Sequence, residues 1–170
     1  MKLVIIEGLD KTGKTTYTRN MFNGFTKIRM PGGSDYSQEL RRHFLEGKIP
    51  KPEMIHLIYG EHMAILERLE REPNKNYVLD RSFISFLAYQ KDCLKEYGFY
   101  EIYKDLLEKK FARLLMLYDV KILYFHKRLV ERKDDWLECM DTDSIKCNFD
   151  ELFEEELFEG LVEHVNVLKA

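Results

Sequence analysis

A run of glycine, lysine and threonine residues near the start of the chain has the types and spacing needed to bind phosphate. Residues 7–16 read EGLDKTGKTT, and they fit the pattern G-x-x-x-x-G-K-[ST] at Gly8, Gly13, Lys14 and Thr15. Glycines allow a loop whose backbone N–H groups point at phosphate oxygens, and a helix that starts beside Gly13 adds its positive end. We expect Lys14 to reach the β- and γ-phosphates of a nucleoside triphosphate and the Thr15 hydroxyl to bind Mg²⁺.

The segments on either side of this loop match the context that such a motif requires. Lys2–Ile6 is an apolar run that predicts a buried strand, and Thr15–Phe22 has apolar residues at helical spacing. Thr12 and Thr16 lie within the same loop and helix start, so we predict that they also bind the triphosphate, which we take to be ATP.

The whole chain alternates between strand-like and helical patterns, which predicts an α/β fold with a five-stranded parallel sheet and helices on both faces. Ligands of such sheets bind beyond the carboxyl ends of the strands. The predicted strands are Lys2–Ile6, Phe25–Met30, Tyr77–Asp80, Val120–Phe125 and Val165–Leu168. The predicted helices are Thr15–Phe22, Ser37–Leu45, Glu53–Glu70, Ile84–Cys93, Tyr100–Tyr118 and Asp150–Val162.

Composition narrows the class of protein. The 170 residues, 45% of them hydrophobic, suit one domain spanning 1–170. A net charge of −3 argues against binding of a nucleic acid polymer. The apolar run at the start is too short for a signal peptide or a membrane span, so no membrane association is expected. Three cysteines without paired spacing predict reduced thiols, and we expect a soluble, cytoplasmic protein.

A second set of charged residues follows the second and third predicted strands. These stretches read RMPGGSDYSQELRR and VLDRSFISFLAYQ, and they place Arg29, Arg41 and Arg81 at the same sheet edge. A guanidinium group matches phosphate oxygens bidentately, so the three arginines can converge on a second anionic group. Asp80 ends the third strand, where a carboxylate holds the metal directly or through water, although aspartate at this position can also cap the following helix.

Together these motifs resemble the thymidylate kinase family. The family patterns EG-D-x-x-GK-[ST]-T, a proline-containing turn such as REPGGT, and DR-x-x-x-S-x-x-AYQ stand here, in the same order, as EGLDKTGKTT, RMPGGS and DRSFISFLAYQ. The resemblance implies a three-layer P-loop kinase fold. It also implies transfer of the γ-phosphate of ATP to a deoxypyrimidine monophosphate, most naturally dTMP, with Mg²⁺ as cofactor and small-molecule nucleotides as partners.

Residue roles carry over where the motifs match. Asp10 matches the loop acid that helps organise the sugar and phosphate of the acceptor nucleotide. Arg81 matches the arginine that grips the acceptor phosphate, and Arg41 is similar to a second one on the following helix. Pro31 matches the turn proline, often cis, that shapes the acceptor pocket.

Other matches concern the acceptor's sugar and base. Ser85 matches the serine of the third motif, and Tyr89 matches the aromatic residue that occupies the space of a ribose 2′-hydroxyl, which implies a deoxyribose. Tyr59 is similar to the ring that stacks on the pyrimidine, although its alternative is core packing. Met63 stands where the family usually has an arginine that donates to the base. Because methionine cannot donate that hydrogen bond, either His62 substitutes or base selection is looser.

Cations near the transferring phosphate are expected from two segments. Lys11 resembles the basic loop residue of one subgroup of the family. A predicted lid over about 127–147 contains Arg128 and Arg132, which are one helical turn apart and can face the triphosphate. Their alternative is a solvated charged helix. The chain ends at Ala170 directly after the last predicted strand, where family members continue into a further helix, which suggests a compact form.

Three alternatives remain open at this point. A deoxynucleoside kinase shares the architecture but needs a carboxylate base beside its hydroxyl acceptor, and Asp10 can act as that base. A broad-specificity deoxynucleoside monophosphate kinase would follow from the loss of the arginine at position 63. A GTP-dependent switch needs the motif N-K-x-D, but residues 74–77 read NKNY.

A homodimer is possible, as in many family members.

Overall fold

The computed structural model describes residues 1–10, 12–32, 38–40, 42–43, 46, 51–126 and 141–165. In chain order the elements are β1 (Lys2–Gly8), α1 (Lys14–Met21), β2 (Thr26–Arg29), α3 (Lys51–Arg71), β3 (Tyr77–Asp80), α4 (Phe83–Glu96), α5 (Tyr100–Leu115), β4 (Asp119–Phe125), α6 (Thr142–Phe153), the 3₁₀ helix η2 (Glu156–Phe158) and β5 (Val162–Val165). None of the helices in this part of the chain is both long enough and apolar enough to cross a membrane.

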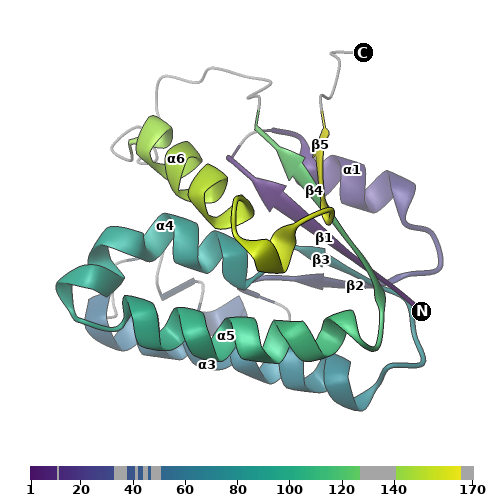
Figure 1. Ribbon diagram of the computed structural model, residues 1–170, viewed down its shortest axis with the longest axis horizontal. Coiled ribbons are helices and arrows are strands. Elements are labelled where there is room, and N and C mark those ends of the chain that lie inside the picture. Colours follow the sequence, from purple (N-terminus) through teal and green to yellow (C-terminus); the bar gives the residue numbers. More distant parts are fainter. Residues whose placement is uncertain are drawn as a thin grey trace.

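The five strands form one sheet in the order β2-β3-β1-β4-β5, and every neighbouring pair is parallel (Figure 1). In its centre, Ile6 of β1 is in register with Asp80 of β3 and with Leu123 of β4. On the far side of β3, Asp80 is in register with Arg29 of β2. The predicted five-stranded parallel α/β fold is therefore confirmed, and the ends of β1, β2 and β3 meet at one edge.

Helices cover both faces of the sheet, as predicted, because inward-facing side chains alternate along each strand. Val4 and Ile6 point to the face that α1 covers, where they pack with Tyr17. Leu3 and Ile5 point to the opposite face and join the larger core beneath α3, α4, α5 and α6. Figure 1 shows the resulting three layers, and among the described helices α1 alone lies on its side of the sheet.

The last helix and the last strand lie earlier in the chain than the sequence pattern predicted. α6 starts at Thr142, because the Asp141 side chain caps it by accepting the backbone N–H groups of Asp143 and Ser144 at 3.1 and 3.2 Å. It ends at Phe153 rather than at Val162.

The earlier start of the last strand follows from the point at which the chain first pairs with β4. The Leu161 carbonyl accepts the N–H of Ile122 at 2.8 Å, so pairing starts there and β5 begins at Val162 rather than at Val165. Residues 166–168 of the predicted strand lie outside the described part of the chain. Gly160, with φ of 72°, turns the backbone just before this contact.

Candidate active site

The loop between β1 and α1 contains two glycines in backbone conformations that other residues adopt at a cost. Gly8 has φ of 125°, and a Cβ placed there would lie 2.0 Å from the carbonyl oxygen of Phe125. Gly13 has φ of 86° and lies at the N-terminus of α1, where its carbonyl accepts the N–H of Tyr17 at 3.0 Å. The strand, loop and helix that the phosphate-binding motif requires are therefore all present.

Lys14 is the first residue of α1, and its side chain turns back over the loop. The side-chain ammonium donates to the carbonyl of Leu9 and, at 3.3 Å, to the hydroxyl of Thr12. Burial lowers the pKa of Lys14 to about 7, and the nearby charge of Arg81 acts in the same direction. A bound triphosphate would reverse that effect by supplying negative charge, so the site is built for an anionic ligand.

Thr15 and Asp80 bring together two oxygen groups from different parts of the chain. The Thr15 hydroxyl donates to the Asp80 carboxylate at 3.0 Å. Ser82 caps α4 by accepting the N–H of Ile84, so Asp80 does not serve as that cap. Among the residues the structure describes, no group of three or more His, Cys, Asp or Glu side chains can hold a metal. A hydroxyl and one carboxylate suit Mg²⁺, which is usually held by one or two protein groups together with substrate phosphates and water.

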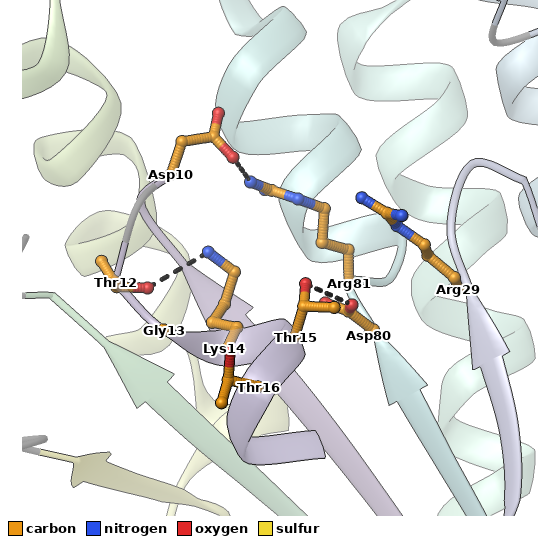
Figure 2. Close-up of a pocket in the computed structure, with 9 residues that line it drawn as sticks. All are labelled: Asp10, Thr12, Gly13, Lys14, Thr15, Thr16, Arg29, Asp80 and Arg81. Atoms are coloured by element: carbon orange, nitrogen blue, oxygen red, sulfur yellow. Dashed lines mark hydrogen bonds and ion pairs between the residues drawn. The ribbon is translucent and has the colours of Figure 1, made fainter. Parts of the chain in front are cut away.

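Arg81 follows β3 directly and turns its side chain back toward the phosphate-binding loop (Figure 2). Its φ of 73° is unusual for a non-glycine residue, and such a conformation costs on the order of 1 kcal/mol. Its guanidinium pairs with the Asp10 carboxylate, donates to Ser85 Oγ at 3.2 Å and lies 5.0 Å from the ring centre of Tyr89. Three of the predicted acceptor residues therefore gather around one arginine.

A cleft of about 220 Å³ lies between the loop and the strand ends. Lys14 enters it from α1, whereas Arg81 and Arg29 enter it from the ends of β3 and β2 (Figure 2). The cleft thus places cations on two sides of one space. Its lining consists of Asp10, Thr12, Gly13, Lys14, Thr15, Thr16, Arg29, Asp80 and Arg81.

The structure places Tyr59 and Met63 away from this cleft. Tyr59 stacks on Tyr103 of α5, with ring centres 3.8 Å apart and planes inclined by 10°. Met63 packs against the large core, and neither residue belongs to the described lining of the cleft. The structure thus shows packing of α3 against α5 for this ring, the alternative that the sequence left open. Stacking of Tyr59 on a base stays a prediction.

His62 also does not belong to the described lining of the cleft. It is only 2% exposed and lies beside Phe86, with 5.4 Å between ring centres. Burial lowers the pKa of His62 to about 3, so the ring is neutral near pH 7. The structure therefore places His62 beside Phe86 in the core, and its substitution for an arginine at position 63 stays a prediction.

The remaining predicted residues divide into two groups. The Met30–Pro31 peptide bond is cis, as expected from the resemblance, and the N–H of Gly32 after it donates to Glu61 of α3 at 3.0 Å. Other predictions lie outside the described residues: Lys11, Arg41, Arg128, Arg132 and the segment 127–140. Since α6 begins at Thr142, the last residues of the predicted lid belong to that helix.

Glu7 is a residue of the site that reasoning from the sequence missed. It is fully buried at the end of β1 and accepts hydrogen bonds from the hydroxyls of Ser82 and Ser85. A signal was available, because Leu3, Ile5 and Glu7 alternate on one face of the strand, so the pattern predicts a carboxylate in the core. Buried carboxylates need partners and often mark functional sites.

Comparison with known proteins identifies sequence relatives of one kind. The chain is 30% identical over 149 residues to a thymidylate kinase of Mycoplasmoides gallisepticum, a match that covers 76% of this chain and 68% of that protein. It is 32% identical over 94 residues to a thymidylate kinase of Campylobacter lari, covering 52% and 48% of the two chains. The match spans about half the length of that relative and of several from Campylobacter jejuni. No protein-family model matches the sequence.

Solved structures share the fold at low sequence identity. A thymidylate kinase from Ehrlichia chaffeensis superposes with a TM-score of 0.59 and 15% identity, covering 99% of this chain and 90% of the other. A deoxyadenosine kinase from M. mycoides with bound dATP superposes with a TM-score of 0.55 and 14% identity, covering 96% and 90%. At these identities the likeness concerns the fold, which both types of kinase share.

Proposed function

The chain belongs to the thymidylate kinase family, and on this basis we propose that it transfers the γ-phosphate of ATP to a deoxypyrimidine nucleoside monophosphate, with dTMP as the first candidate. The observation that carries the proposal is the cleft with cations on two sides. Lys14 lies on the side of the phosphate-binding loop, and Arg81 faces it from the end of β3. A second cationic site across from the first suits an acceptor that is itself a phosphate.

Transfer between two phosphates needs little covalent chemistry from the protein. The second pKa of a phosphate monoester is about 6, so the acceptor oxygen is already anionic near neutral pH and no general base is required. The protein has to align two nucleotides and offset the repulsion between their charges. The residues of the cleft are suited to that task, since most of them are cations, hydroxyls or backbone donors.

Each residue then has a definite task. The loop N–H groups around Gly13 and the Lys14 ammonium bind the β- and γ-phosphates. Thr15 and Asp80 hold Mg²⁺, which when bound neutralises phosphate charge. Arg81 binds the acceptor phosphate. To do so, its guanidinium must either release the Asp10 carboxylate or bind both groups at once.

Residues outside the described part of the chain complete the proposal. We assign Lys11 to the transferring phosphate, Arg128 and Arg132 of the lid to the triphosphate, and Arg41 to the acceptor phosphate. These assignments rest on the family resemblance of their motifs, within a single domain spanning 1–170. An added cation at the transferring group is worth about 10³ to 10⁵ in rate in related phosphoryl-transfer enzymes.

A deoxynucleoside kinase is the second candidate function. The observation in its favour is Asp10, whose carboxylate lies at the mouth of the cleft and can take the proton of a 5′-hydroxyl. In the structure this carboxylate is paired with Arg81, so the second function requires that the pair opens to free a base. Phosphorylation of a monophosphate also requires the Asp10–Arg81 pair to open, but there the group that is freed is the guanidinium.

One assay separates the candidates. The protein is incubated with Mg-ATP and, separately, dTMP, dUMP, dCMP, dGMP, dAMP, UMP and thymidine, and conversion is followed by chromatography. Conversion of dTMP alone is the expected result. Conversion of all deoxynucleoside monophosphates means that the absence of an arginine at position 63 leaves base selection broad. Conversion of thymidine without dTMP overturns the proposal in favour of the nucleoside kinase.

A further inference from the structure

The carboxylate of Glu7, near the end of β1, does not belong to the described lining of the cleft. It is fully buried, and burial raises its pKa, whereas the hydroxyls of Ser82 and Ser85 and the charge of Arg81 act in the opposite direction. An ionised carboxylate in a core is costly unless it is paired and hydrogen-bonded. The position therefore needs an explanation beyond core packing.

The hydrogen bonds of Glu7 lead to Arg81 through one serine. Ser85 donates its single hydroxyl proton to one oxygen of Glu7, and its lone pairs accept Arg81 Nη1 at 3.2 Å. A hydroxyl can point its proton in several directions, but a carboxylate accepts only. Glu7 thus keeps the proton of Ser85 turned away from Arg81, which leaves an acceptor facing the guanidinium.

The same guanidinium is held at two further points. Nη1 is 3.5 Å from the carbonyl oxygen of Gly8, the residue after Glu7, and Nη2 pairs with Asp10. When an acceptor phosphate takes the place of Asp10, the contacts to Ser85, to Gly8 and to the face of the Tyr89 ring remain. Of these three, Ser85 makes the shorter of the two hydrogen bonds, because the Gly8 contact is long.

We propose that Glu7 is a positioning residue for acceptor binding: by fixing the hydroxyl of Ser85, it holds the guanidinium of Arg81 in the place where it meets the acceptor phosphate. This inference rests on the proposed function, in which Arg81 binds the phosphate of a nucleoside monophosphate. Glu7 itself touches no substrate and acts through Ser85 and Arg81.

A purely structural role is the alternative, and the chain offers a matched control for it. Ser82 also donates to Glu7, at 2.5 Å, and it is buried in the same turn of α4. It additionally caps α4 by accepting the N–H of Ile84 at 3.2 Å. Among the described hydrogen bonds, none joins Ser82 to the guanidinium of Arg81. Removing either serine hydroxyl takes one hydrogen-bond donor from Glu7. Only the removal of the Ser85 hydroxyl also breaks the link to Arg81.

The test compares Ser85→Ala, Ser82→Ala and Glu7→Gln in the full chain. Steady-state KM values for dTMP and ATP are measured together with the calorimetric Kd for dTMP and the thermal midpoint. We expect Ser85→Ala to raise the KM and Kd for dTMP about 10-fold, as for loss of a hydrogen bond to a charged group, and to leave the KM for ATP within about twofold. Ser82→Ala should lower the thermal midpoint through loss of the cap and leave both dTMP constants within about twofold.

Glu7→Gln keeps the size of the side chain but presents N–H groups as well as an oxygen. We expect Glu7→Gln to raise the KM and Kd for dTMP as Ser85→Ala does. The double variant Glu7→Gln/Ser85→Ala should raise these constants by less than about twofold beyond either single variant, because both changes break the same link. Should Glu7→Gln fail to fold, Glu7→Asp is measured in its place: it keeps the carboxylate but is one methylene shorter, and we expect it to raise the dTMP constants in the same direction.

Outcomes for this inference and for the proposed function can be told apart. Equal dTMP constants in the two serine variants, in a wild type that phosphorylates dTMP, overturn the positioning role alone. A wild type that neither binds nor converts any monophosphate, or that converts only thymidine, overturns both, since the acceptor then brings no phosphate to Arg81.

Discussion

Asp10 and Arg81 form an ion pair across the candidate site, one from the loop after β1 and the other from the end of β3. The pair offsets the charge of a half-buried guanidinium. It also sets the position from which the arginine can move to an anionic ligand. The first prediction concerns this arginine.

Replacing Arg81 with alanine should lower kcat/KM for dTMP by about 10² to 10³, because a charged group loses its partner in a partly buried site. Arg81→Lys should restore little, since an ammonium cannot make the two parallel bonds of a guanidinium. Initial rates over a range of dTMP concentrations measure both variants. Activity of Arg81→Lys within about threefold of wild type would contradict the bidentate role.

Substitution of Thr15 should change the metal requirement. Thr15→Val removes the hydroxyl that lies 3.0 Å from Asp80, and we expect a loss of roughly 100-fold in rate together with a higher Mg²⁺ concentration for half-maximal activity. Thr15→Ser keeps the hydroxyl and is the control, with a Mg²⁺ dependence close to that of wild type. The measurement is a titration of rate against free Mg²⁺, and identical curves for the valine and serine variants would remove Thr15 from the metal site.

Binding of ATP should take up a proton at pH 8. The pKa of Lys14 is about 7 in the nucleotide-free protein, so at pH 8 most of the ammonium has lost its proton, and a triphosphate favours the charged form again. Affinity for ATP should therefore fall as pH rises above about 7. Calorimetry in two buffers with different ionisation enthalpies measures the uptake, which Lys14→Met should abolish. Absence of uptake in the wild type would show that Lys14 is already charged before ATP binds.

Two glycines provide a matched pair for stability. Gly8→Ala should destabilise the fold by at least about 2 kcal/mol, because φ is 125° and the new Cβ would lie 2.0 Å from a carbonyl oxygen of β4. Gly24→Ala should cost only about 1 kcal/mol, because φ is 82° but no other atom lies within 4 Å. Denaturant unfolding of both variants measures the difference, and equal losses would mean that the close approach to β4 relaxes freely.

His62 should make the folded protein sensitive to acid. Its pKa is about 3 in the folded state against about 6.5 in the unfolded state, so between these values the unfolded chain binds the extra proton. Stability is then lost as pH falls from about 6.5 toward 3, and His62→Leu should lose less over that range. Urea midpoints at pH 8 and pH 5 test this. A wild type and variant with parallel pH dependence would show that His62 is protonated without cost.

Much of the site could be predicted from the sequence because its constraints are local. The phosphate-binding loop is contiguous, and its glycines are required by backbone angles within a few residues. Strand β3 was predicted with its observed bounds, since four buried residues bracketed by turns need no distant partner to be recognised. The bounds of the last helix were predicted wrongly. Its start depends on the Asp141 cap, and its end depends on where the following chain first hydrogen-bonds to β4.

Amino-acid type and order alone therefore determined the family, the parallel sheet and the candidates for phosphate binding. The tertiary structure decided which of them meet. Arg81 reaches Asp10 across 71 positions of sequence, and Glu7 reaches Ser85 across 78, because parallel strands bring their ends to one edge of the sheet. The direction of the Tyr59 ring was likewise decided by the packing of α3 on α5, since periodicity identifies an apolar face but not the side chain that will lie against it.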